Sequence, residues 1–197
     1  MKLKLLAAAA ATTMFGAAAN AATITPVLAD CDAGLSNTPA AEASVMCGGA
    51  GRADASAVNL GAPDGAFYSL GIDFADGRGG GAVFAIDPMF TGPAAVVEVT
   101  FTPSPHAEAA EVGVALADAF GNFDASTLQS VGFVDNGEGG LVAPTTSVSF
   151  SGYWNFIVFQ DVSAMYYPGT SSEDGFDIDS VSVTTVPLPA GALLLGG

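Results

Sequence analysis

Apolar and polar residues alternate along much of the chain between residues 57 and 185. Residues 68–74 and 97–102 place large apolar side chains at every second position, which is the period of a half-buried antiparallel strand. Further strand-like runs occupy residues 81–86, 111–117, 128–134, 146–150 and 176–184. Turn residues separate these runs, and Pro88 is expected to mark one such break.

Residues 153–162 differ from the other runs because they are apolar on both faces. Trp154 and Phe156 would lie on one face of a strand, and Ile157 and Phe159 on the other. A strand with this pattern is typical of the centre of a sheet that is covered on both sides. Trp154 is therefore expected in the core.

Residues 107–120 allow two interpretations. Their first five positions are good helix formers, whereas the apolar positions that follow suit a strand, which we favour. With this strand included, some eight short strands are separated by frequent turn signals. The pattern predicts an all-β protein, a single β-sandwich of jelly-roll type.

The first residues have the features of a secretory signal peptide. Lys2 and Lys4 form a basic start, residues 5–15 are apolar, and Ala19-Asn20-Ala21 is a small-x-small cleavage site. The mature chain is expected to begin near Ala22. We expect four segments: a signal peptide (1–21), a disulfide-bearing N-terminal segment (22–56), a β-sandwich domain (57–185) and a truncated C-terminal sorting segment (186–197).

The chain is strongly acidic. It has 20 Asp and Glu residues against four Lys and Arg, for a formal net charge of −16. Removal of the signal peptide would leave Arg52 and Arg78 as the only strong bases. Nucleic acid is therefore not expected as a partner, and anionic lipid is a poor one.

Cys31 and Cys47 are the only cysteines. In an exported chain an even count predicts a disulfide, and the loop of about 16 residues between them would contribute on the order of 3 kcal/mol. A metal site or a catalytic thiol is the alternative. It is disfavoured because no histidine is near either cysteine and the spacing fits no zinc pattern.

The C-terminal segment contains the sequence Val186-Pro187-Leu188-Pro189-Ala190, followed by a short apolar run. The two prolines fix φ and remove backbone donors, so this segment is expected to be extended and accessible. The motif resembles the VPLPA variant of the PEP-CTERM sorting signal of Gram-negative bacteria. The Gly/Ala/Asp-rich strands and residues 174–181 are also similar to proteins of that class.

This resemblance implies an exported protein, located outside the cell or on the surface of a Gram-negative bacterium. It also implies an exosortase-type processing protease as a partner. In that class a full hydrophobic helix and an arginine cluster follow the motif, whereas here about eight apolar residues follow it. A bilayer span needs about 20 such residues, so membrane association is expected only transiently, and only if the natural C-terminus is longer.

Three aspartates are close together before the last expected strand. Asp174, Asp177 and Asp179 surround Gly175, and carboxylate oxygens on a tight turn are ligands that Ca²⁺ prefers. Calcium is therefore the one cofactor that the sequence suggests, with these three residues as its ligands. The alternative is an acidic, solvated strand entrance without an ion, and the spacing fits no EF-hand loop.

The same segment predicts an irregularity in the strand. Its apolar residues up to Ile178 and those from Val181 onwards fall on opposite faces. Because a strand alternates with a period of two, this change predicts a bulge near Asp179 or Ser180.

Few residues suit catalysis. His106 is the only histidine and is expected in a solvated loop, and no Gly-x-Ser-x-Gly motif is present. Glu98 and Glu111, on neighbouring expected strands, are the first carboxylate pair to consider for glycoside hydrolysis. Carboxylates on a solvated strand face are ordinary in an acidic sandwich, so we expect no enzyme and no catalytic residue.

The function expected is that of a secreted or surface-displayed, non-enzymatic protein. The PEP-CTERM resemblance implies association with extracellular polysaccharide or biofilm matrix. The alternative is a secreted glycan-binding lectin or glycan hydrolase on the same fold, because sandwiches carry both. Exposed aromatic rings beside carboxylates would favour glycan binding, and Tyr166 and Tyr167 are the aromatics expected to be exposed.

Overall fold

Nine β-strands dominate the described part of the computed structural model, which covers residues 21–31, 45–49, 51–99, 106–137 and 145–186. The strands are β1 (Thr23–Ala29), β2 (Asn59–Leu60), β3 (Tyr68–Ser69), β4 (Gly81–Glu98), β5 (Ala109–Ala115), β6 (Gln129–Asp135), β7 (Thr145–Val148), β8 (Trp154–Asp161) and β9 (Asp177–Thr185). The helical elements are η1 (Ala55–Ala57), η2 (Ala125–Thr127) and α1 (Ser163–Tyr166). The prediction of an all-β protein is confirmed.

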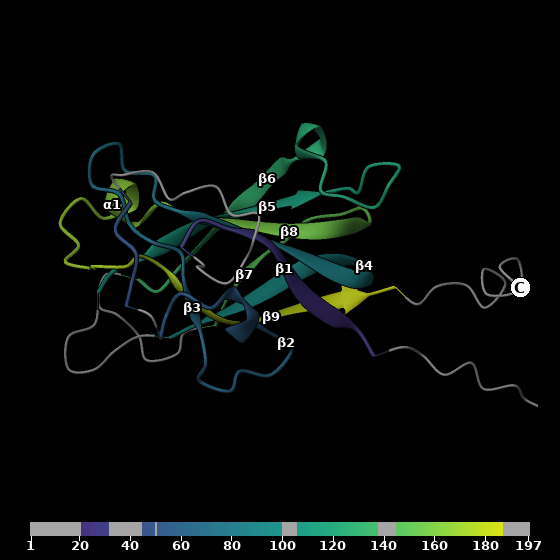
Figure 1. Ribbon diagram of the computed structural model, residues 1–197, viewed down its shortest axis with the longest axis horizontal. Helices are drawn as coiled ribbons and strands as arrows, with labels where there is room; N and C mark the ends of the chain where they lie inside the picture. Colours follow the sequence, from purple (N-terminus) through teal and green to yellow (C-terminus); the bar gives the residue numbers. More distant parts are fainter. Residues whose placement is uncertain (1–20, 32–44, 50, 100–105, 138–144, 187–197) are drawn as a thin grey trace, which may run out of the picture. The chain divides into compact units, whose positions relative to one another are not determined.

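The strands pair in the order β2-β9-β4-β8-β5-β6, and β1 and β7 pair with β4 while β3 pairs with β9 (Figure 1). All pairings are antiparallel except that of β2 with β9. These strands belong to one unit, residues 22–187. The jelly-roll connectivity stays a prediction.

Strand β4 corrects the expected break at Pro88. Residues 81–86 and 97–102 were expected to form separate strands, but β4 runs without interruption for 18 residues. Its first half pairs with β1 and β8, and its second half with β7 and β9. Pro88 and Pro93 lie where the registers with β8 and β9 shift, because proline has no N–H to donate to a ladder.

Strand β8 lies between β4 and β5, as expected for a central strand (Figure 1). Ile157 and Phe159 are buried in the main core on one face. Phe156 belongs to a smaller apolar cluster on the other face. Trp154 is also in the main core, so its predicted burial is confirmed.

Two further expectations are confirmed in β5 and β9. The ambiguous stretch forms strand β5. In β9, Ser180 is opposite Val97 and Ile178 is opposite Glu98, so Asp179 is an extra residue. This is the bulge that the change of apolar face predicted.

The N-terminal segment contributes to the same sheet through β1, which the hydrophobic pattern did not indicate. Its register with β4 shifts between Pro26 and Leu28, so the pairing is irregular. Cys31 follows β1, is buried in the core and forms the predicted disulfide with Cys47. The disulfide therefore links the end of β1 to the segment that begins at residue 45.

Two expected features fall outside the described residues: the signal peptide up to Asn20, and Pro187 to Ala190 of the sorting motif. Among the helices in the described ranges, none has the length and apolar composition needed to cross a bilayer.

Candidate functional site

Three neighbouring strands bring chemically distinct side chains into one row. Glu111 of β5 is the register partner of Gln160 in β8 and of Phe133 in β6. Directly opposed residues in antiparallel strands point to the same face of a sheet. The row therefore places an amide, a carboxylate and an aromatic ring side by side.

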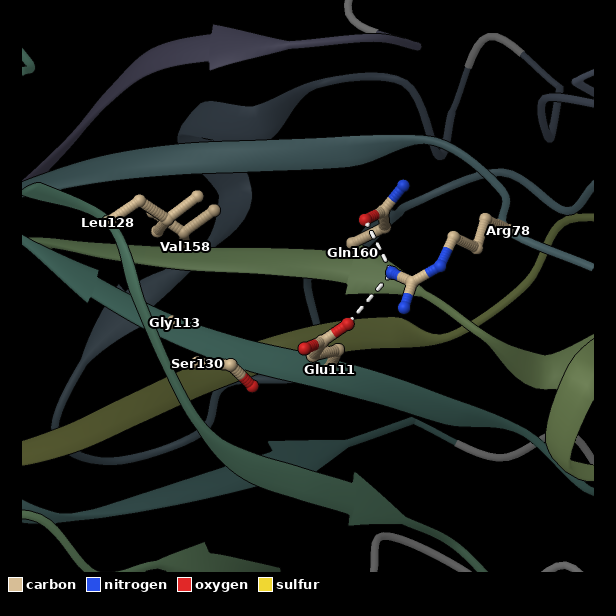
Figure 2. A pocket seen from close by; sticks show the side chains of 7 residues that line it. All are labelled: Arg78, Glu111, Gly113, Leu128, Ser130, Val158 and Gln160. Carbon is tan, nitrogen blue, oxygen red and sulfur yellow. Dashed lines mark hydrogen bonds and ion pairs between the residues drawn. The ribbon is translucent and has the colours of Figure 1, made fainter. Parts of the chain in front are cut away.

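A pocket of about 260 Å³ lies over this part of the sheet (Figure 2). It is lined by Arg78, Glu111, Gly113, Leu128, Ser130, Val158 and Gln160. Leu128 and Val158 form its apolar end, and Figure 2 shows Arg78, Glu111 and Gln160 grouped at the other. The pocket therefore combines an apolar wall with a cluster of hydrogen-bonding groups.

Gly113 keeps the apolar end of the pocket open. A Cβ atom at this position would lie 2.9 Å from Leu128 Cδ1 and 3.6 Å from Val158 Cβ. Any side chain there would displace Leu128 or occupy the space between the two apolar residues. The absence of a side chain at residue 113 therefore contributes to the shape of the pocket.

Arg78 organises the polar end. Its Nη1 donates to Glu111 Oε2 at 2.8 Å and to Gln160 Oε1 at 3.0 Å. The pKa of Glu111 is lowered by the hydrogen bond from Ser130 and by the nearby Arg78 guanidinium. Glu111 is thus an ionised acceptor at neutral pH, and its charge and that of Arg78 compensate each other. Among the residues that the structure describes, none accepts a hydrogen bond from Nε or Nη2 of Arg78.

Exposed aromatic rings continue the surface beyond Glu111. Phe133 is 39% exposed and Tyr166, in α1, is 45% exposed. Their ring centroids are 5.0 Å apart. Tyr167 is half-buried, and its hydroxyl donates to Asp135 Oδ1 at 3.2 Å. The expected exposure is confirmed for Tyr166 and is only partial for Tyr167.

A second hollow, of about 370 Å³, adjoins this aromatic group. It is lined by His106, Ala107, Tyr166, Tyr167, Pro168, Gly169, Thr170 and Ser171. His106 Nδ1 lies 2.9 Å from Ser171 Oγ. That distance suits a base and a nucleophile, but in the described part of the chain no carboxylate is hydrogen bonded to the His106 ring to orient it.

The expectation that Glu98 and Glu111 lie on neighbouring strands is wrong. Strand β8 lies between β4 and β5, so the two residues are not on neighbouring strands. Glu111 pairs with Arg78, whereas Glu98 is only 1% exposed and accepts a hydrogen bond from Asn136 Nδ2 at 3.1 Å. The carboxyl partner of Glu98 is Glu108, to which it is hydrogen bonded.

Glu98 and Glu108 belong to a buried acidic cluster with Asp174, Asp177 and the guanidinium of Arg52. Burial and the charge of Asp177 raise the pKa of Glu108 to about 11. Burial and the charge of Asp174 raise the pKa of Asp177 well above its usual value. Arg52 forms an ion pair with Asp174, and its charge partly offsets the rise in the pKa of Asp177. The cluster therefore favours protons or further positive charge.

The three aspartates proposed as calcium ligands do not all have the same hydrogen-bond partners. The hydroxyl of Ser69 is hydrogen bonded to both Asp174 and Asp177, so these two carboxyls lie close together. Asp179 instead accepts from the backbone N–H groups of residues 64 and 65, at 3.0 and 2.9 Å. Among the described residues, no three acidic, cysteine or histidine side chains converge as ligands of one ion. Calcium binding stays a prediction.

Most residues of the pocket were not found from the sequence. Glu111 was singled out, but with the wrong partner. Arg78 could have been found as one of only four Lys and Arg residues in the chain. Gln160 and Phe133 carry no local signal, because only the register of three strands places them beside Glu111.

Comparison with known protein families and with curated proteins found no match for this chain.

Proposed function

We propose that this chain is an exported, non-enzymatic protein that binds extracellular polysaccharide through the pocket over β8, β5 and β6. The observation that carries the proposal is the grouping of Arg78, Glu111 and Gln160 next to an apolar wall (Figure 2). A sugar ring has hydroxyl groups at its rim and C–H groups on its faces. Such a ligand needs directed polar groups and an apolar surface in one site.

The electrostatics of the pocket favour binding over hydrolysis. Glycoside hydrolysis ordinarily uses two carboxyl groups, one of which must be protonated to act as a general acid. Glu111 is the only carboxylate among the residues that line this pocket, and its pKa is lowered. An ionised Glu111 accepts hydrogen bonds from sugar hydroxyls but is a poor acid at neutral pH.

Charge also favours a neutral glycan. Arg78 and Glu111 compensate each other within the pocket, while the whole chain has a formal net charge of −16. Acidic polysaccharides would be repelled by the surrounding surface. Neutral sugars avoid this cost and still meet the hydrogen-bond donors of the Arg78 guanidinium.

Export and surface location are part of the same proposal. The disulfide between Cys31 and Cys47 is compatible with an oxidising compartment. The likeness of residues 186–190 to the PEP-CTERM signal supports processing by an exosortase-type protease in a Gram-negative bacterium. A protein delivered in this way would meet polysaccharide outside the cell.

The test is a binding screen of the full exported protein against immobilised neutral and acidic glycans. We expect neutral glycans to bind and Arg78→Ala to weaken that binding at least tenfold. The matched control is Gln129→Ala, an exposed position on β6 that does not line the pocket. Release of reducing sugar from a bound glycan would favour a hydrolase, and absence of binding to every glycan would contradict the proposal.

A further inference from the structure

The pocket is continuous with the exposed aromatic rings through the sheet register. Phe133 is the direct cross-strand partner of Glu111, so its side chain is the neighbour of Glu111 on the same face of the sheet. Adjacent strands are about 4.8 Å apart, so Gln160, Glu111 and Phe133 span roughly 10 Å across β8, β5 and β6.

Tyr166 extends this line beyond the sheet. Its ring meets that of Phe133 at a centroid distance of 5.0 Å, and it also lines the second hollow. The Tyr167 ring is 6.2 Å from that of Tyr166, and its hydroxyl bond to Asp135 holds the tyrosine pair against β6. The surface from the pocket to the second hollow is thus formed by residues in successive contact.

Polar and apolar groups alternate along this surface. The pocket offers donors and acceptors, the two exposed rings offer flat apolar faces, and the second hollow again offers polar groups at His106 and Ser171. Aromatic faces stack on the C–H faces of pyranose rings, while polar groups orient the hydroxyls.

We infer that the pocket, the rings of Phe133 and Tyr166 and the second hollow form one binding track for an extended chain of neutral sugars. This inference rests on the proposed glycan binding and adds to it the length of the ligand. One sugar occupies the pocket at Arg78 and Glu111, the next stacks on Phe133 and Tyr166, and the chain continues toward His106. The separate contacts act together because they bind one molecule.

The test is calorimetric titration of the full exported protein with sugars of increasing length. The ligands are glucose and its oligomers of two, four and six units in β-1,4, β-1,3 and α-1,4 linkage, and the matching mannose and galactose series. We expect affinity to rise at least tenfold from the monosaccharide to the tetrasaccharide in at least one series. Tyr166→Ala and Phe133→Ala should remove most of this gain while leaving monosaccharide binding unchanged.

Two control variants test whether the effect needs the aromatic ring of Tyr166 and whether loss of any exposed aromatic ring has the same effect. Tyr166→Phe keeps the stacking face and should retain the gain. Phe120→Ala removes a ring that is 89% exposed at a turn that lines neither hollow, and should bind as wild type. Thermal melts of all variants confirm that they remain folded.

The outcomes separate this inference from the proposed function. Equal affinity for one and four sugars, or unchanged tetrasaccharide binding in Tyr166→Ala, would overturn the track and leave the pocket as a single-sugar site. Absence of binding in every series would overturn both. If light scattering shows a dimer that Tyr166→Ala dissociates, the rings serve self-association and the track is wrong.

Discussion

The carboxyl groups of Glu98 and Glu108 are hydrogen bonded to each other in the interior, where the two residues are 1% and 4% exposed. Glu98 ends β4 and Glu108 precedes β5. Two carboxyls can form such a bond only when one of them holds a proton. Asn136 donates to Glu98 and Ser172 donates to Glu108, which fixes the pair in place.

This pair predicts that the protein loses stability as pH rises. The pKa of Glu108 is raised from 4.5 to about 11, and burial raises that of Asp161 from 3.8 to about 6. A raised pKa in the folded state contributes stability that is fully present below the unfolded value and is lost as pH rises toward the folded value. The free energy of unfolding should therefore fall as pH rises, between about 3.8 and 6 through Asp161 and between about 4.5 and 11 through Glu108. The slope is up to about 1.4 kcal/mol per pH unit for each extra proton that the folded state binds.

Urea unfolding at several pH values measures this dependence. The control is Glu108→Gln, in which a neutral amide replaces the protonated carboxyl and cannot titrate. The slope of unfolding free energy against pH should become shallower in this variant. Identical slopes in wild type and variant would show that Glu108 is not the group responsible.

The disulfide is expected to contribute substantially to stability. Cys31 is buried in the main core, its backbone N–H donates to the Tyr68 hydroxyl at 2.9 Å, and its bond to Cys47 closes a separation of 16 residues. Replacing both cysteines by alanine should lower the free energy of unfolding by on the order of 3 kcal/mol. Urea unfolding of the oxidised wild type, the reduced wild type and the double variant measures this. Equal midpoints for all three would contradict the prediction.

Much of the fold could be predicted from local patterns, because strand periodicity and burial depend on neighbouring residues. The strands β5, β6, β7, β8 and β9 and the bulge at Asp179 follow from that signal. The break predicted at Pro88 was wrong. Proline is rare inside strands, but it is tolerated here because the register of β4 with β8 shifts at this point. Strand β1 gave no usable signal because Pro26 interrupts a short segment.

The site was harder to predict because it depends on contacts between distant segments. Exposure of Tyr166 follows from its position next to a turn, and Glu111 was a candidate for its strand position alone. The neighbours of Tyr166 and Glu111 depend on the order of the strands, which hydrophobic periodicity does not reveal. Phe133 contacts Tyr166 and is paired with Glu111 because β6 pairs with β5. The Glu98 and Glu108 pair is likewise a product of chain topology.

Calcium binding is predicted at Asp174 and Asp177, with Asp179 in a separate role. Arg52 already pairs with Asp174, and burial together with the charge of Asp174 raises the pKa of Asp177. A divalent ion that displaces the proton of Asp177 and binds only the folded arrangement would stabilise that arrangement. At about ten times a millimolar Kd, Ca²⁺ should add about 1.4 kcal/mol, and Mg²⁺ should add much less because of its stricter geometry.

Thermal melts with and without each ion test this expectation. Asp177→Asn should lose the response to Ca²⁺. Asp179→Asn should retain it, because its carboxylate is engaged with residues 64 and 65. An equal response in wild type and Asp177→Asn would show that the ion acts on the overall negative charge.

Gly113→Ala should weaken glycan binding without unfolding the protein. The new Cβ would lie 2.9 Å from Leu128 Cδ1, the end of a flexible side chain that can rotate, and 3.3 Å from the Gln129 carbonyl oxygen. Leu128 would move into the apolar end of the pocket, so we expect at least a tenfold loss of affinity. The change in the free energy of unfolding should stay within about 1 kcal/mol, since alanine also removes the backbone-entropy cost of glycine in a strand.

The matched control is Gly51→Ala, where a Cβ meets no atom within 4 Å. Titration with the tightest-binding oligosaccharide measures affinity, and urea unfolding measures stability. Loss of affinity with retained stability would support glycan binding in this pocket. Wild-type affinity in Gly113→Ala would contradict it.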